Sequence, residues 1–194
     1  MCADLALGGT TPDLQLLLKC RSQIKIPVFM LVRPREGDFL YTDAEHDTMI
    51  GQIRRAKNAG AHGIVTGELT SDRHVAEART AALVEVARPL PVTFHRAFDD
   101  CLELGAALEA VIRTGANRVL TSGGARTAPD GADRIARLVT QAKGRIEILA
   151  GGGIDADNVV RVIQDSGVKE VHFSVHDAEK VRQVRRILGC DNSQ

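Results

Sequence analysis

The chain has 194 residues, with 25 Lys and Arg against 25 Asp and Glu, so its formal net charge is zero at pH 7. This length supports a sizeable core, and we expect residues 1–194 to form a single domain. A neutral chain argues against nucleic acid as the main partner, because phosphate backbones attract clustered positive charge. Aromatic residues make up 3% of the chain and Trp is absent, which argues against a platform for stacking bases.

The cysteine pattern and the absence of a long apolar run indicate a cytoplasmic protein. Cys2, Cys20, Cys101 and Cys190 form no C-x-x-C pair, and four cysteines in a chain this long do not make a disulfide framework. No apolar run approaches the ~18–20 residues that span a bilayer, and no signal peptide opens the chain. We therefore expect a reducing compartment, the cytoplasm and secondarily the nucleus, and no membrane partner.

Short apolar runs alternate with helix-like segments along the chain. The runs are dense in Val, Ile, Leu and Phe, as in parallel strands buried on both faces. They lie at 27–32, 63–66, 91–94, 118–121, 147–150 and 170–174. The helical segments lie at 12–22, 43–59, 73–87, 101–114, 130–142, 156–166 and 177–188. This alternation predicts an α/β fold with right-handed crossovers.

About six strands and seven helices fall short of a closed barrel, which needs eight strands and ~250 residues. The first helix follows only a short loop-like stretch, so we predict an incomplete (β/α)8 TIM barrel without its first strand-helix unit and second strand. An open doubly wound sheet is the alternative, but no Gly-x-Gly-x-x-Gly follows the first strand. The strands at 27–32 and 170–174 would then have unpaired edges.

Two helix starts carry recognisable capping signals. Thr42 and Glu45 have the spacing of a capping box, in which each side chain satisfies a free amide of the other residue. Asp155 precedes the sixth helical segment and is predicted to cap it.

The stretch 91–99 is the most informative for chemistry, because an apolar strand ends there in His95, Arg96 and Asp99. Residues at the carboxyl ends of strands form the active face in repeated strand-helix folds. Glu68 ends the preceding strand in the same way and could act as a general base or a binding group. These four residues are the candidate catalytic set. The plainer alternative is that Arg96 pairs with Asp99 to hold a loop, and that Glu68 forms a salt bridge.

Groups suited to an anion follow the other strands. Arg33 could grip a carboxylate or phosphate, or it could pair with Glu68, whereas the neighbouring Arg35 is expected to be structural. Ser122 and Gly123 offer a hydroxyl and backbone amides. Gly151, Gly152 and Gly153 leave the backbone bare after a late strand, where barrels often bind phosphate. A tight turn needing positive φ is the alternative for this run.

Soft metal ligands are sparse. Cys2, Met30, His95 and Cys101 are groups that could bind Cu(I) or Zn(II), but their spacing fits no zinc signature. Judged by residue type alone, each cysteine is better explained as a buried, unreactive side chain.

Five segments in order resemble the CutC copper homeostasis family, and the resemblance runs from about Cys2 to the final helix. They are Gly-Gly-Thr-Thr-Pro at 8–12, Ile-Pro-Val with Arg-Pro-Arg-Glu-Gly-Asp-Phe at 26–39, Pro-Val-Thr-Phe-His-Arg-Ala-Phe-Asp at 91–99, Arg-Val-Leu-Thr-Ser-Gly at 118–123 and Gly-Gly-Gly-Ile at 151–154. The resemblance implies a TIM barrel and a role in intracellular copper handling. It also implies Cu(I) binding and a homo-oligomer, as described for animal members.

In the family, a cysteine ends the second strand just before the Gly-Gly-Thr-Thr-Pro motif, and Cys2 matches that position. The resemblance therefore implies Cys2 as the Cu(I) ligand, and no organic cofactor is predicted. A segment after the last strand is short relative to the family. Two alternatives stay open: an enzyme acting on a small anionic or phosphorylated metabolite at the barrel mouth, and an inactive truncated isoform. In the enzyme, Arg33 and Arg96 would bind the anion, and His95 and Glu68 would move protons.

Overall fold

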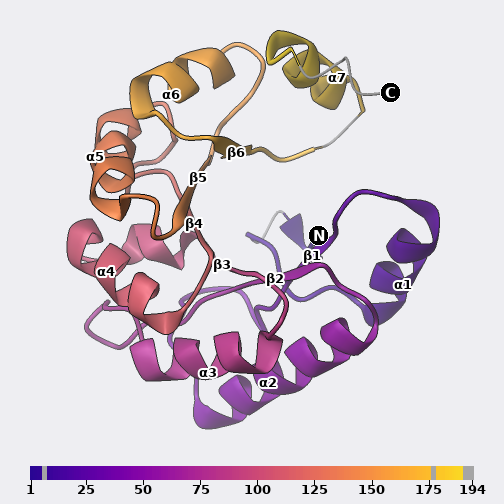
Figure 1. Ribbon diagram of the computed structural model, residues 1–194. Helices are drawn as coiled ribbons and strands as arrows, with labels where there is room; N and C mark the ends of the chain where they lie inside the picture. The colour runs from indigo at the N-terminus through magenta and orange to yellow at the C-terminus, as the bar shows by residue number, and fades with distance from the viewer. Residues whose placement is uncertain (6–7, 176–177, 190–194) are drawn as a thin grey trace.

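The computed structural model describes residues 1–5, 8–175 and 178–189, and within these ranges six strands alternate with seven α-helices (Figure 1). The strands are β1 (Phe29–Leu31), β2 (Gly63–Thr66), β3 (Val92–Phe94), β4 (Arg118–Thr121), β5 (Glu147–Gly151) and β6 (Glu170–His172). The helices are α1 (Leu14–Gln23), α2 (Asp43–Asn58), α3 (Glu77–Ala87), α4 (Leu104–Thr114), α5 (Ala132–Ala142), α6 (Val159–Ser166) and α7 (Ala178–Ile187). A 3-10 helix, η2 (Arg96–Asp100), follows β3. Cys190 lies outside the described residues.

The strands form one parallel sheet in the order β1-β2-β3-β4-β5-β6, so each strand pairs with its neighbour in sequence. The sheet curves into an open arc, with helices along its outer side and with β1 and β6 at its two ends (Figure 1). The predicted incomplete TIM barrel is confirmed. Within the described ranges, no helix has the length and apolar character needed to cross a membrane.

Of the two predicted helix caps, one is present in the structure and one is not. The capping box at α2 is confirmed, since the Glu45 amide donates to Thr42 Oγ1 (3.3 Å) and the Thr42 amide to Glu45 Oε2 (2.8 Å). The predicted cap at Asp155 is wrong. Its carboxylate accepts the amides of Asp157 and Asn158 in a turn that ends before α6 begins, and Asn158 is the N-cap residue without a side-chain bond.

The core lies between the sheet and the surrounding helices. Large apolar side chains with no solvent exposure come from each of α1 to α5 and from the strands: Leu17, Ile53, Leu83, Leu108, Ile135, Ile64 and Phe94. The inner face of the arc is more polar. There Arg118 pairs with Glu170 (Nε to Oε2, 2.6 Å), and its guanidinium lies 5.3 Å from the centre of the Phe29 ring. These contacts tie β1, β4 and β6 together across the interior.

The free edge of β1 has a backbone partner, contrary to expectation. The amino group of Met1 donates to the Phe29 carbonyl (2.5 Å), and the Leu31 amide donates to the Met1 carbonyl (3.0 Å). Ala3 and Thr10 then pair in an antiparallel bridge. Residues 1–3 therefore occupy the place beside β1 that a further strand would take, which protects that edge from pairing with another chain.

Candidate functional site

The carboxyl ends of the six strands lie at one edge of the sheet because the strands are parallel. Candidate residues follow each of the first five strands at this edge: Arg33, Glu68, His95, Ser122 and Gly152. Their hydrogen-bond partners divide them into three groups. One group gathers under the loop after β1, one carboxylate is bonded to the helices, and a third group joins the ends of β3, β4 and β5.

Arg33 is buried and holds two loops together. Its Nη1 donates to the Gly9 carbonyl (2.9 Å) and its Nη2 to the Gly37 carbonyl (2.8 Å), and the guanidinium lies 4.9 Å from the centre of the Phe39 ring. The alternative of a pair with Glu68 is not what the structure shows. The charge of Arg33 remains close enough to His95 to lower the pKa of that imidazole.

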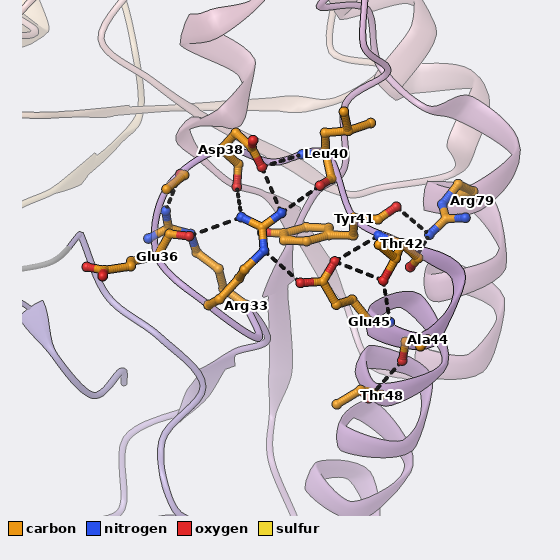
Figure 2. Close-up of polar contacts among 12 residues, drawn as sticks. Arg33, Glu36, Asp38, Leu40, Tyr41, Thr42, Ala44, Glu45, Thr48 and Arg79 are labelled. Atoms are coloured by element: carbon orange, nitrogen blue, oxygen red, sulfur yellow. Dashed lines mark hydrogen bonds and ion pairs between the residues drawn. The ribbon is translucent and has the colours of Figure 1, made fainter.

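Arg35 fastens the loop after β1 from the outside, as expected for a structural residue. Its guanidinium donates to Glu45 (2.6 Å), to Asp38 Oδ1 (2.8 Å) and to the Leu40 carbonyl (2.7 Å), and it lies 5.2 Å from the centre of the Tyr41 ring. Figure 2 labels these three partners, Asp38, Leu40 and Glu45, and marks the bonds with dashed lines. The loop that covers this part of the strand ends is therefore held at several points.

Glu68 is almost completely buried, with 1% exposure, and its carboxylate is used by two helices. It lies 2.5 Å from His46 Nδ1 on α2 and accepts from Arg79 Nε on α3 at 2.6 Å. A buried carboxylate needs such partners to offset its lost hydration. The alternative reading of Glu68 as a salt-bridge residue matches this geometry, and the structure does not bring Glu68 together with Arg33 and His95.

His95 is buried at the start of η2 beneath the loop after β1. Its Nδ1 accepts the Ala97 amide (3.3 Å), and its ring centre lies 4.9 Å from that of Phe39. Burial, and then the charge of Arg33, lower the pKa of His95 to about 3. The ring is therefore neutral at pH 7, with the proton on Nε2. Nε2 is buried without a hydrogen-bond partner among the described residues, so His95 presents a donor rather than a base.

Arg96, Asp99 and Ser122 form a continuous network between β3 and β4. Arg96 Nε donates to Asp99 Oδ2 (2.8 Å), and Arg96 Nη2 donates to Ser122 Oγ (2.7 Å). The Arg96 side chain is 41% exposed, whereas that of Asp99 is only 7% exposed. The pair predicted as the plainer alternative is present, and it fixes one edge of the guanidinium while leaving Nη1 outside the network.

Asp99 fills the loop that follows β4. Its carboxylate accepts the amides of Ser122 (3.0 Å) and Gly124 (2.9 Å) and the hydroxyl of Thr121 (2.5 Å). The Gly123 amide is bonded to Thr121 Oγ1 (2.8 Å). The amides of Ser122 and Gly124 thus bind the chain's own carboxylate, whereas the amide of Gly123, which was predicted to bind an anion, is bonded to Thr121 instead.

The glycine run after β5 has backbone amides that are not occupied by a carboxylate, unlike those of the loop after β4. Gly152 and Gly153 have φ angles of +104° and +69°, which L-residues with side chains rarely adopt. Their carbonyls accept from the Ala128 amide (2.8 Å) and from Asn158 Nδ2 (2.9 Å). Neither amide nitrogen donates a hydrogen bond to a described residue. Gly151 is buried at the end of β5, where a Cβ would come within 2.6 Å of Leu120. The turn reading is correct, and it leaves two amides available.

His172 is a residue that the sequence analysis left out of the candidate set. It ends β6 opposite Gly151, and its Nδ1 lies 3.4 Å from the position of a Cβ on that glycine. Burial lowers the pKa of His172, and the positive charges of the N-terminal amine and of Arg96 lower it further. The signal was present, because His172 occupies the last position of the sixth strand.

Cys2 is partly buried near the start of the chain, away from any cluster of metal ligands. Its Sγ lies 3.4 Å from the position of a Cβ on Gly9. Burial lowers the pKa of the Met1 amino group, which lies beside Cys2 in the chain. No group of three or more His, Cys, Asp and Glu side chains that could hold a metal occurs in the described part of the chain.

The fold and the strand-end groups together define an α/β protein of the TIM-barrel class. The chain belongs to the CutC family, whose sequence pattern matches residues 1–177, so the resemblance noted above is confirmed. The human copper homeostasis protein cutC homolog is 47% identical over 174 residues, which cover 90% of this chain and 64% of the relative. A CutC family protein of Vibrio campbellii is 46% identical over 176 residues, which cover 90% of this chain and 71% of the relative.

Solved structures agree with this placement. The CutC structure from Streptococcus agalactiae superposes with a TM-score of 0.84 at 32% identity, and the match covers 88% of this chain and 85% of the other. Deoxyribose phosphate aldolase from Aeropyrum pernix reaches a TM-score of 0.69 at 14% identity over 90% and 74% of the two chains, a likeness of fold alone. The present chain spans 64% of the human and 65% of the mouse relative's length.

Proposed function

We propose that this chain serves in copper homeostasis and binds Cu(I) through Cys2. Family membership carries the proposal, since the human relative is named for copper homeostasis. Thiolate is the softest ligand type in the chain, and soft ligands select Cu(I). We further propose a cytoplasmic homo-oligomer.

The test is a Cu(I) titration of the reduced protein against a competing chromophoric chelator. Cys2→Ser should weaken the stoichiometric affinity by about tenfold or more, because a hydroxyl is a poor ligand for a soft ion. Cys101→Ser is the matched control: that thiol is buried, and burial raises its pKa to about 11, so it should not contribute. Equal affinity of Cys2→Ser and the wild type would remove Cys2 from the site and direct attention to Met30 or to adventitious binding.

A second candidate is an enzyme acting on a small anionic metabolite at the strand ends. The observation that favours it is the grouping of Arg96, Ser122 and Gly152, because an ideal Cβ on Gly152 would lie 3.1 Å from Arg96 Nη1. A neutral His95 would polarise a substrate oxygen by donating from Nε2 rather than by removing a proton. An inactive isoform is the third alternative, and saturable binding of either ligand would count against it.

A further inference from the structure

We infer that the end of β5 forms an oxyanion site in which the amides of Gly152 and Gly153 and Arg96 Nη1 bind a phosphate monoester group. This site is separate from the copper proposal. It rests on the second candidate function, the enzyme for a small anionic metabolite, because it uses the same strand ends. Binding of phosphate can nevertheless be tested without any catalysis.

Two amides at the end of β5, those of Gly152 and Gly153, donate to no described residue. The Gly152 carbonyl accepts the Ala128 amide, and this bond holds the peptide group that carries the Gly153 N–H. Both residues have positive φ angles, and free N–H groups in a turn are a common binding site for anions. Gly152 is partly exposed and Gly153 is exposed, so an incoming ion can reach both amides.

Arg96 supplies a guanidinium at the same place, with part of its charge offset by Asp99. Asp99 and Ser122 hold its Nε and Nη2, which fixes the plane of the guanidinium. Nη1 then lies over Gly152, 3.1 Å from where a Cβ would stand. A side chain at residue 152 would press on the guanidinium, so glycine lets Nη1 lie close to the backbone, where an anion at the edge of the turn can contact both. Preorganised donors of this kind lose little freedom when a ligand binds.

A neighbouring imidazole extends the donor set. His172 lies beside Gly151 at the end of β6, and Arg96 is close enough to lower its pKa. A neutral ring can donate one further hydrogen bond without requiring a proton from solution. Four donors from three strand ends suit a tetrahedral oxyanion with several oxygens better than a planar carboxylate, and this favours a phosphate monoester as the ligand.

The contrast with the loop after β4 supports the assignment. That loop has the same kind of amides, but Asp99 occupies them, so an external anion would meet a negative charge there. Asp99 and the amides at the end of β5 lie on either side of Arg96. The carboxylate therefore anchors the guanidinium from one side while the other side stays open to a ligand.

The experiment is calorimetric titration at pH 7.5 with two probes, inorganic phosphate and glycerol 3-phosphate, on wild type, Arg96→Gln, Gly152→Ala and Gly144→Ala. Gly144 is the matched control, since it has φ +73° and no atom lies within 4 Å of the place where its Cβ would stand, whereas a Cβ at residue 152 would meet Arg96. We expect saturable 1:1 binding in the wild type. Arg96→Gln and Gly152→Ala should each weaken it by on the order of tenfold or more, and Gly144→Ala by less than about twofold.

Tighter binding of glycerol 3-phosphate than of inorganic phosphate supports a monoester ligand, and the reverse order rejects the monoester assignment. No saturable binding, or equal affinities in all four proteins, would mean an adventitious ion only and would overturn the site. Cu(I) titrations of the same variants separate the two proposals, because none of the three substitutions is at Cys2 or at a residue that contacts it. Phosphate release from glycerol 3-phosphate, followed separately, tests the enzyme proposal without bearing on the binding result.

Discussion

Replacing Asp99 with Ala tests whether an internal carboxylate organises the strand ends. The substitution removes the acceptor for Arg96 Nε, Thr121 Oγ1 and the amides of Ser122 and Gly124. Arg96 and Gly124 are accessible enough to bond water instead. Thr121 and Ser122 have no solvent exposure, so their donors would be left unsatisfied.

The size of the effect follows from those two buried donors. Each unsatisfied buried donor costs about 1–3 kcal/mol, so the two donors together should lower the free energy of unfolding of Asp99→Ala by about 2–6 kcal/mol. That is a large part of a typical domain stability of about 5–15 kcal/mol. Asp99→Asn keeps the volume and one acceptor oxygen but places an NH2 group against backbone donors, so we expect an intermediate loss.

Urea unfolding followed by circular dichroism gives these free energies by linear extrapolation. Asp72→Ala is the control, because Asp72 accepts from Thr70 Oγ1 at 2.5 Å but its side chain is 71% exposed. We expect a much smaller loss there, because an exposed carboxylate exchanges its partner for water. A loss of less than about 1 kcal/mol in Asp99→Ala would refute the reasoning, since the loop after β4 would then keep its shape without the carboxylate.

Two further predictions concern buried ionisable groups. Glu68→Gln should destabilise the fold by about 3 kcal/mol in the same urea assay, because it breaks a buried charge cluster. Glu77→Gln is the control, since Glu77 pairs with Arg113 at the surface, and it should cost less than about 1 kcal/mol. Equal losses in the two variants would contradict this account. His95 has a folded-state pKa of about 3, below its ordinary 6.5, so the unfolded chain takes up the proton first as the pH falls. The contribution of neutral His95 to stability is thus complete above about pH 6.5 and is lost toward pH 3. The difference in free energy of unfolding between the wild type and His95→Asn should therefore shrink over this range by up to roughly 4 kcal/mol. A difference that stays constant from pH 7 to 4.5 would contradict this expectation.

The strand and helix positions were predictable because each element carries a local signal. The apolar runs mark buried parallel strands, and Thr42 with Glu45 marks the start of α2. Asp155 misled because an Asp that bonds amides two and three residues ahead looks the same in sequence whether or not a helix begins at once. The backbone partner of β1 was missed because Met1 carries no strand signal of its own.

Whether a strand-end side chain lies inside the arc or toward the helices depends on the alternation of side chains along the strand. The sequence contains this alternation, but the register between strands is needed to say which residues share a face. Leu31, Val65 and Thr93 are aligned across the first three strands on one face of the sheet. Residues two positions after a strand residue share its face. Arg33 and His95 follow Leu31 and Thr93 by two positions, and both lie under the loop after β1.

The same counting separates Glu68 from that group. Glu68 follows Thr66 and Ile64 at intervals of two, and Ile64 is fully buried in the core that the helices cover. Its side chain therefore points toward α2 and α3, where His46 and Arg79 bond it. The position of Glu68 after a strand correctly placed it at the carboxyl edge of the sheet. It did not show that the side chain lies on the face that the helices cover.

The two glycine-containing loops show why a motif alone could not identify the anion site. Both Ser122-Gly123-Gly124 and Gly151-Gly152-Gly153 offer amides at the end of a parallel strand. What distinguishes them is a residue far away in sequence, since Asp99 lies 23 positions before Ser122 and occupies its amide. A carboxylate held there repels an external anion and at the same time anchors Arg96, whose other side faces Gly152. The occupied loop thus directs an anionic ligand to the open one, and the binding position follows from where the chain has placed its own negative charge.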